Sequence, residues 1–182
     1  MILDLRKVLM LCVAMVVVSF GASAQSVMAN DTLNAGFVSR TVNEFFAYWQ
    51  KKPFRAVPER TITLITDIDA SLLPDTLIGM PVVVLGNEDM LRRRKYRKLT
   101  REKVYKVKVN ASAPDTIDVI LIRWEVSIEG KRMGIAVESR ETIGGFVPDG
   151  RFVYDAVEKR WKASFYEELQ EQKLIEVGLK SK

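Results

Sequence analysis

The strongest constraint on the fold is a pair of alternating apolar runs at residues 122–126 and 133–137. Glu129-Gly130 lies between them, and a two-residue turn there would join the runs into an antiparallel hairpin. A slip of one residue would put Trp124 opposite a polar or small neighbour, so the register is well specified. The expected cross-strand pairs are Val126 with Met133, Trp124 with Ile135 and Ile122 with Val137.

A second hairpin is predicted from Arg151 to Phe165. A four-residue turn at Ala156–Lys159 would pair Tyr154 with Trp161, and Asp155 with Arg160 as an ion pair. Alternation also predicts strands at residues 61–68 and 104–109, and a short edge strand at Pro81–Leu85. The second of these strands carries Lys106 and Lys108 on one face.

Three helices are expected around these strands. Asn30 or Asp31 caps the first, whose stripe of Val38, Val42, Phe45 and Trp49 has helical spacing, and Pro53 ends it. A small basic helix begins at Asn87, and a last helix spans about Tyr166 to Val177. The sequence therefore predicts an α+β fold, with an amphipathic N-terminal helix packed on an antiparallel sheet of five or six strands, an inserted basic helix and a C-terminal helix.

The order of these elements resembles the cystatin-like or NTF2-like architecture. The resemblance is carried by the Val38–Trp49 stripe and by the hairpins at Glu129-Gly130 and Ala156–Lys159. It implies a curved sheet that wraps one helix, and the basic helix at Asn87 departs from it. It implies no activity, because one fold supports many functions.

Residues 1–24 have the three parts of a cleavable secretory signal. Arg6 and Lys7 precede an apolar run from Val8 to Phe20, and small residues follow up to Ala24. The apolar run is shorter than the roughly 20 residues of a membrane-spanning helix. We therefore expect an exported protein, periplasmic or extracellular, with residues 25–182 forming one domain without a transmembrane span.

Two residue types that carry much of enzyme chemistry are missing. The chain has no histidine, and its one cysteine, Cys12, lies in the expected signal. This excludes serine–histidine and cysteine–histidine nucleophile pairs, zinc sites with nitrogen and sulfur ligands, and iron–sulfur clusters in the mature chain. The mature chain also has no disulfide. We expect no cofactor and no metal, and the sequence leans away from an enzyme.

Charge is concentrated between Arg92 and Lys108. Ten basic residues and Glu102 give this segment a charge of +9, whereas residues 25–182 carry 26 basic and 22 acidic residues once Arg6, Lys7 and Asp4 are removed. The rest of the mature chain is therefore at −5, and the predicted function is a binding module with a basic surface for an anionic protein, glycan or lipid. Nucleic acid is disfavoured for an exported chain. The candidate anion-binding residues are Arg92, Arg93, Arg94, Lys95, Arg97, Lys98, Arg101, Lys106 and Lys108, and the candidate aromatic contacts are Tyr48 and Tyr96.

Two carboxylate pairs keep other functions open. Asp67 and Asp69 could share a hard cation or cap backbone amides at a loop start. Glu125 and Glu129 lie on the strand face opposite Trp124, either lining a glycosidase-like cleft or forming an exposed charged face. The alternatives are thus a small-ligand-binding or carboxylate-dependent hydrolase domain with a pocket on the sheet, and a structural domain that associates with itself through a sheet edge.

Overall fold

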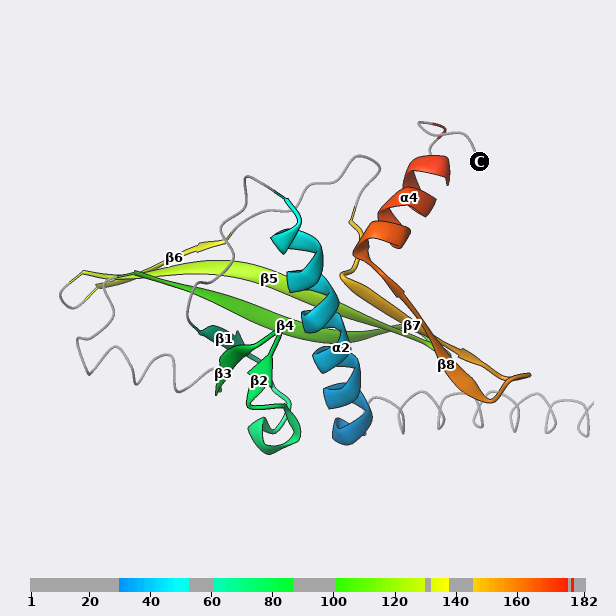
Figure 1. Cartoon of the computed structure of the whole chain (residues 1–182), viewed down its shortest axis with the longest axis horizontal. Helices are drawn as coiled ribbons and strands as arrows, with labels where there is room; N and C mark the ends of the chain where they lie inside the picture. Colours follow the sequence, from blue (N-terminus) through cyan, green and yellow to red (C-terminus); the bar gives the residue numbers. More distant parts are fainter. Residues whose placement is uncertain are drawn as a thin grey trace, which may run out of the picture.

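The protein is a mixed β-sheet crossed by one long helix, as Figure 1 shows for a computed structural model. The structure describes residues 30–52, 61–86, 101–129, 132–137, 146–176 and 178. The expected signal at residues 1–24 and the expected basic helix from Asn87 lie outside this part of the chain. The elements are α2 (Asp31–Gln50), β1 (Ile62–Ile65), η1 (Ala70–Leu72), β2 (Thr76–Leu77), β3 (Met80–Leu85), β4 (Arg101–Ala113), β5 (Thr116–Glu129), β6 (Arg132–Val137), β7 (Gly150–Asp155), β8 (Arg160–Phe165) and α4 (Tyr166–Glu176).

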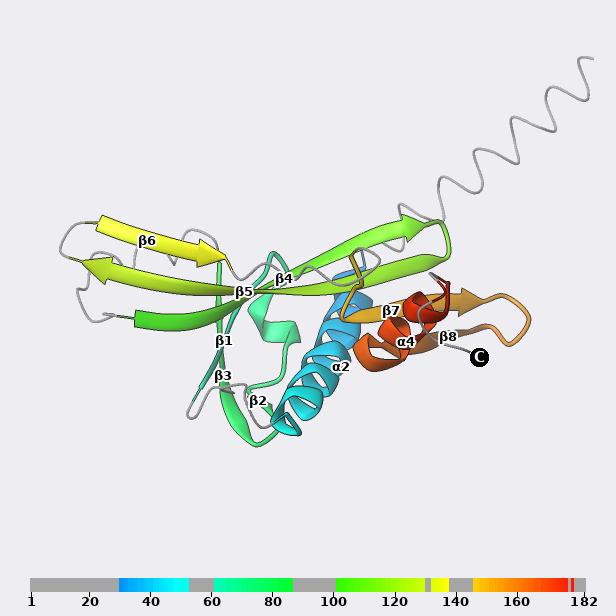
Figure 2. The same cartoon turned by 90° about the horizontal axis from the view of Figure 1, so that it is seen from above.

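Helix α2 begins and ends as the sequence predicts. The side chain of Asn30 accepts a hydrogen bond from the backbone N of Leu33 at 3.0 Å, which satisfies one of the free amides of the first turn. Val38, Val42 and Phe45 are buried, and Trp49 packs at the margin of the same cluster. The helix lies across the sheet in both views (Figures 1 and 2), so its apolar stripe forms the centre of the core.

The predicted α+β class is confirmed, but the sheet is mixed rather than antiparallel. The strand order is β2-β3-β1-β4-β5-β7-β8, with β6 also paired to β5, which makes eight strands in the described residues. Strand β1 runs parallel to both β3 and β4. All four of its residues are buried, as expected of an interior strand. Alternation alone could not predict this, because it reports faces and not strand direction.

Strand β3 corresponds to the predicted edge strand at Pro81–Leu85. Its later residues pair with β1, and its first two residues pair with the short β2. Pro81 lies opposite Thr76 at this margin of the sheet, where a missing N–H interrupts few ladder hydrogen bonds. Among the described residues, β2 therefore covers the outer edge of β3 at only two residues.

The hairpin of β5 and β6 forms with a register different from the predicted one. Trp124 pairs with Val137 and Val126 with Ile135, so the expected pairs of Trp124 with Ile135 and Val126 with Met133 are wrong by two residues. Glu129 pairs with Arg132, which leaves Gly130 and Lys131 between the strands. A two-residue shift keeps the same residues on each face, so the apolar pattern cannot distinguish the two registers.

The second predicted hairpin is confirmed in register. Tyr154 pairs with Trp161 and Asp155 with Arg160, and the two rings are 5.5 Å apart. The expected ion pair between Asp155 and Arg160 is replaced, because Asp155 binds Lys162 and Arg160 binds Glu158. The strand pairing was thus predictable, whereas the partners of the long charged side chains were not.

The sheet carries buried residues on both faces. The larger cluster packs against α2 and includes Leu64, Tyr105 and Phe152. The smaller cluster contains no residue of α2 and consists of Ile65, Leu85, Val104 and Val126, with Val83 and Trp124 beside it. Since neighbouring residues of a strand point to opposite faces, the smaller cluster lies on the face away from α2.

Candidate functional site

Two lysines of the predicted basic surface lie on the sheet face away from α2. Tyr105 and Val107 of β4 are buried in the cluster beneath α2, so Lys106 and Lys108 point to the other face. Lys106 is half-buried and Lys108 is exposed. The Nζ atom of Lys106 is 5.0 Å from the centroid of the Trp124 ring, within range of a cation–π contact.

The neighbours of these lysines on β5 are apolar. Lys106 pairs across the strands with Ile122 and Lys108 with Ile120, and both isoleucines are half-buried. Among the described residues, neither lysine forms an ion pair. The face therefore presents two ammonium groups above an apolar strand, with no carboxylate directly opposite.

The other cations that the structure describes on this sheet face have carboxylate partners. Arg151 of β7 binds Asp118 of β5 through two hydrogen bonds of 2.8 and 3.0 Å, and these bonds raise the pKa of Arg151. Lys162 of β8 binds Asp155 at 2.6 Å and Glu158 at 2.9 Å. These pairs neutralise the β7–β8 end of the face, so the uncompensated positive charge is on β4.

Most of the other candidate residues lie outside the described part of the chain. Arg101 is the first residue of β4, where only the backbone is described. Tyr48 is half-buried on α2 and belongs to another site, given below. The candidates outside the described residues are Arg92, Arg93, Arg94, Lys95, Tyr96, Arg97 and Lys98.

An open hollow of about 420 Å³ lies beside the two lysines, between the end of β1 and the first turn of α2. Lys106 and Lys108 line it together with Asp31 and Asp67. Asp67 belongs to the pair that the sequence predicts as a cation site or as a cap, and here it lines a hollow that carries both charges. Three of its ten lining residues are apolar, so the hollow is less apolar than a typical small-ligand cavity.

The structure describes both side chains of the first predicted carboxylate pair, Asp67 and Asp69, but only Glu125 of the second. Asp69 Oδ1 accepts hydrogen bonds of 2.9 Å from the backbone and hydroxyl of Ser71, which lower the pKa of Asp69 and cap η1. Glu125 and Glu129 are four residues apart on one strand, so their backbones are about 13 Å apart along it, and the side chain of Glu129 lies outside the described residues. In the described ranges, no group of three or more acidic, histidine or cysteine side chains is placed to hold a metal ion.

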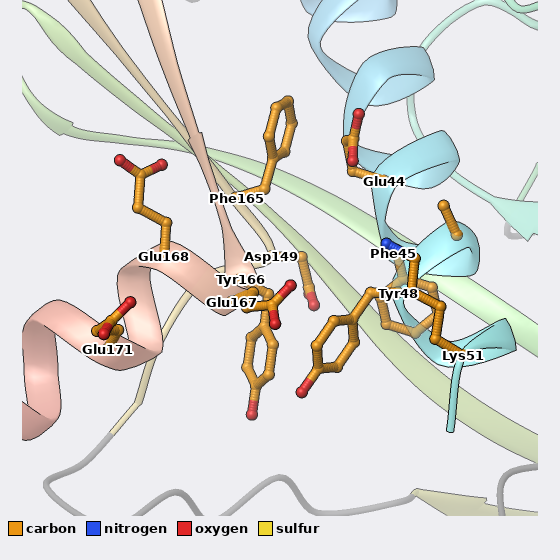
Figure 3. Close-up of a pocket in the computed structure, with 11 residues that line it drawn as sticks. Glu44, Phe45, Tyr48, Lys51, Asp149, Phe165, Tyr166, Glu167, Glu168 and Glu171 are labelled. Atoms are coloured by element: carbon orange, nitrogen blue, oxygen red, sulfur yellow. The ribbon is translucent and has the colours of Figure 1, made fainter. Parts of the chain in front are cut away.

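A second cavity, which we call the α2–α4 pocket, has a volume of about 370 Å³ (Figure 3). Its walls come from the C-terminal half of α2, the residues before β7 and the junction of β8 with α4. Four aromatic residues line it, and Figure 3 shows the rings of Tyr48 and Tyr166 side by side, with centroids 5.6 Å apart. The aromatic lining residues are Phe45, Tyr48, Phe165 and Tyr166, and the glutamates are Glu44, Glu167, Glu168 and Glu171.

Asp149 also lines this pocket, but its carboxylate has a structural role. It is almost fully buried, and Oδ2 accepts a hydrogen bond of 2.7 Å from the backbone N of Leu121. On this edge of β5, the pairing with β7 ends at Val119 and the pairing with β6 begins at Trp124. The Asp149 side chain thus satisfies an amide in the gap between the two strands.

Sequence reasoning missed the α2–α4 pocket. The predicted last helix contains Glu167, Glu168 and Glu171, and acidic residues in the first turn favour the start of α4, but they also line the pocket. The available signal was Tyr48, an aromatic residue off the buried stripe of α2, which the sequence predicts as a contact for a partner. Nothing in the sequence indicated that this element is α4.

No helix in the described ranges combines the length and apolar character needed to cross a membrane. The chain matches no protein-family model, no curated protein and no solved structure.

Proposed function

We propose that the protein is an exported, non-enzymatic binding module that uses the basic surface between Arg92 and Lys108 to dock on an anionic partner. One observation carries the proposal: Lys106 and Lys108 share one face of β4 and form no ion pair among the described residues. The other described cations of that face, Arg151, Arg160 and Lys162, each bind a carboxylate.

The surroundings of the two lysines favour binding to anions. Ile120, Ile122 and Trp124 form a half-buried apolar strip beside them, so a docked partner would exclude water from the charged groups. Electrostatic attraction is stronger where water is excluded. The partner chemistry that fits is an anionic lipid surface, an acidic glycan or the acidic face of another protein.

Vesicle binding tests the proposal. The purified protein is mixed separately with three anionic probes at increasing salt concentrations: vesicles that contain phosphatidylglycerol, an acidic polysaccharide and an acidic protein. Vesicles of phosphatidylcholine alone are the uncharged control. We expect binding to at least one anionic probe that weakens as salt rises. Each lysine near an anionic surface contributes about 1 kcal/mol, so Lys106→Gln with Lys108→Gln should weaken binding about 30-fold.

The matched control removes the same charge elsewhere. Lys103 of β4 points to the opposite face, and Lys159 lies in the β7–β8 turn. Lys103→Gln with Lys159→Gln should leave most of the affinity intact. Equal loss in both double variants would indicate a response to net charge and would contradict a localised site. A stable oligomer that binds no anion, at any salt concentration, would instead favour the self-associating domain.

A further inference from the structure

The α2–α4 pocket is distinct from the basic face and has its own chemistry. Its aromatic wall is formed by half-buried rings that the core does not fully cover, including Tyr48, Phe165 and Tyr166. Tyr48 contacts both Trp49 and Tyr166, with centroids 4.8 and 5.6 Å away. Both tyrosines are therefore held in place by neighbouring rings before any ligand arrives.

The rim of the pocket is acidic. Glu44 of α2 and Glu167, Glu168 and Glu171 of α4 line it, against Lys51 as the basic lining residue. Glu44, Glu167 and Glu168 form no ion pair within the described ranges. Glu167 and Glu168 lie in the first turn of α4, where negative charge stabilises the start of a helix. Glu44 lies in α2, so helix stabilisation does not explain its place at the pocket rim.

The ring of Tyr48 lies close to an ammonium group of the protein itself. Lys52 follows α2, and its Nζ atom is 4.7 Å from the centroid of the Tyr48 ring. This distance is typical of a cation–π contact. Lys52 is not a lining residue of the pocket, so this contact shows only that the ring of Tyr48 accommodates an ammonium group.

Together these features select one kind of ligand. Glu44, Glu167 and Glu168 together outweigh the charge of Lys51 and disfavour an anion, and no group of acidic side chains in the described residues is arranged to hold a metal ion. Aromatic rings bind methylene groups and organic cations, while carboxylates accept hydrogen bonds from N–H groups. A cavity of about 370 Å³ is at the small end of the ligand-binding range.

We propose that the α2–α4 pocket binds a primary alkylammonium group, with the chain against Tyr48 and Tyr166 and the ammonium at the glutamate rim. Such a group is present both in a free diamine and in the lysine side chain of a polypeptide. This pocket is independent of the basic face. If the pocket binds no alkylammonium group, the proposed binding of anions by Lys106 and Lys108 is unaffected.

Titration of the isotope-labelled protein with putrescine tests the pocket, because putrescine carries the required group and is small. 1,4-Butanediol is the neutral control of the same length, and Nα-acetyl-lysine methylamide represents the lysine side chain. We expect saturable amide shifts around Tyr48 and Tyr166 with putrescine, a dissociation constant on the order of 1 mM and none of these shifts with the diol. A tighter response to the lysine compound than to putrescine would identify a polypeptide as the source.

Two variants separate the contributions of charge and ring. Glu44→Gln with Glu167→Gln should weaken putrescine binding at least tenfold, and Tyr48→Leu should do the same. The matched control is Glu158→Gln with Glu176→Gln, which removes two glutamates that already bind lysines elsewhere. It should bind putrescine like the unaltered protein.

Three results of the putrescine titration would contradict the proposed pocket. Putrescine shifts that do not saturate, that spread over the whole surface or that persist in the Glu44→Gln and Glu167→Gln variant would show general charge attraction rather than a site. Because Glu44 and Glu167 are exposed, their replacement should not disturb folding. The amide spectrum without putrescine verifies this in the same experiment.

Discussion

The side chain of Thr41 lies directly beneath Gly150 in the middle of the core. A Cβ atom added to Gly150 would be 2.3 Å from Thr41 Oγ1 and 3.1 Å from its Cγ2. Thr41 is fully buried and β-branched, so it has few rotamers with which to move away. We expect Gly150→Ala to lower the free energy of unfolding by about 1–3 kcal/mol, measured by urea denaturation.

The control for this prediction is the same change in a Thr41→Ala background. Removal of the obstructing hydroxyl and methyl should make Gly150→Ala nearly neutral there. An equal cost in both backgrounds would show that the strain comes from the β7 backbone and not from Thr41.

The hydroxyl of Thr41 itself permits a separate prediction. Oγ1 is buried and has no hydrogen-bond partner in the described part of the chain. Burying an unsatisfied hydroxyl is costly, and valine has nearly the same shape without the polar atom. Thr41→Val should therefore raise the free energy of unfolding by about 1 kcal/mol. A loss of stability in the same urea measurement would mean that the hydroxyl is satisfied in solution.

Asn30 and Asp149 show which roles of single residues can be predicted from the sequence and which cannot. The cap at Asn30 was predictable, because its partner Leu33 is three residues away. The bond from Asp149 to Leu121 joins residues 28 apart and depends on where two strands stop pairing with β5. Local patterns contain no information on such a gap.

Replacement of Asp149 tests this role. Asp149→Ala would leave the buried N–H of Leu121 without its acceptor, and we expect a loss of about 1–3 kcal/mol in the free energy of unfolding. Asp149→Asn keeps an oxygen in place and should cost less. Similar losses in both variants, measured by urea denaturation, would indicate that the negative charge rather than the acceptor is required.

At the scale of elements, the β7–β8 hairpin has a turn fixed by one carboxylate. Asp155 accepts hydrogen bonds from the backbone N atoms of Val157 and Glu158 at 2.9 and 3.0 Å, and it binds Lys162. The bond to Lys162, followed by the one to Glu158, lowers the pKa of Asp155 from 3.8 to about 2. The hairpin is therefore stabilised by the ionised form of Asp155.

This shift predicts a pH dependence with a definite sign. Because the pKa is lower in the folded protein, the contribution of Asp155 is complete above about pH 4 and is lost as the pH falls toward 2. Asp155→Asn should remove this part of the acid dependence of the melting temperature and lower stability at neutral pH. An unchanged slope between pH 4 and 2 would show that Asp155 keeps the pKa of an unfolded chain.

The hairpins also show how far the sequence predicts elements. The β7–β8 register followed from a four-residue turn flanked by matched residues such as Tyr154 and Trp161. The β5–β6 pairing was displaced by two residues, because either register preserves the faces. The parallel pairing of β1 was missed for a different reason, since strands distant in the sequence select their neighbours through the folded core.

On the scale of the whole molecule, the two hydrophobic clusters are joined through shared strands. In β1, Leu64 belongs to the cluster beneath α2 and Ile65 to the cluster on the other face. In β4, Tyr105 and Val104 divide in the same way. Because adjacent residues share one backbone, neither cluster can lose its packing while the other keeps the sheet intact. We therefore expect the clusters to unfold together, as one cooperative domain.

Tryptophan fluorescence can follow this coupling from each face. The chain has three tryptophans, and only Trp124 packs against the smaller cluster. In a Trp49→Phe and Trp161→Phe background, the urea midpoint of Trp124 fluorescence should coincide with the midpoint of far-UV circular dichroism. Leu64→Ala, on the face away from Trp124, should lower both midpoints together through a loss of about 2–5 kcal/mol. A Trp124 transition that occurs earlier, or that ignores Leu64→Ala, would mean that the basic face of the sheet unfolds independently of the helix-covered core.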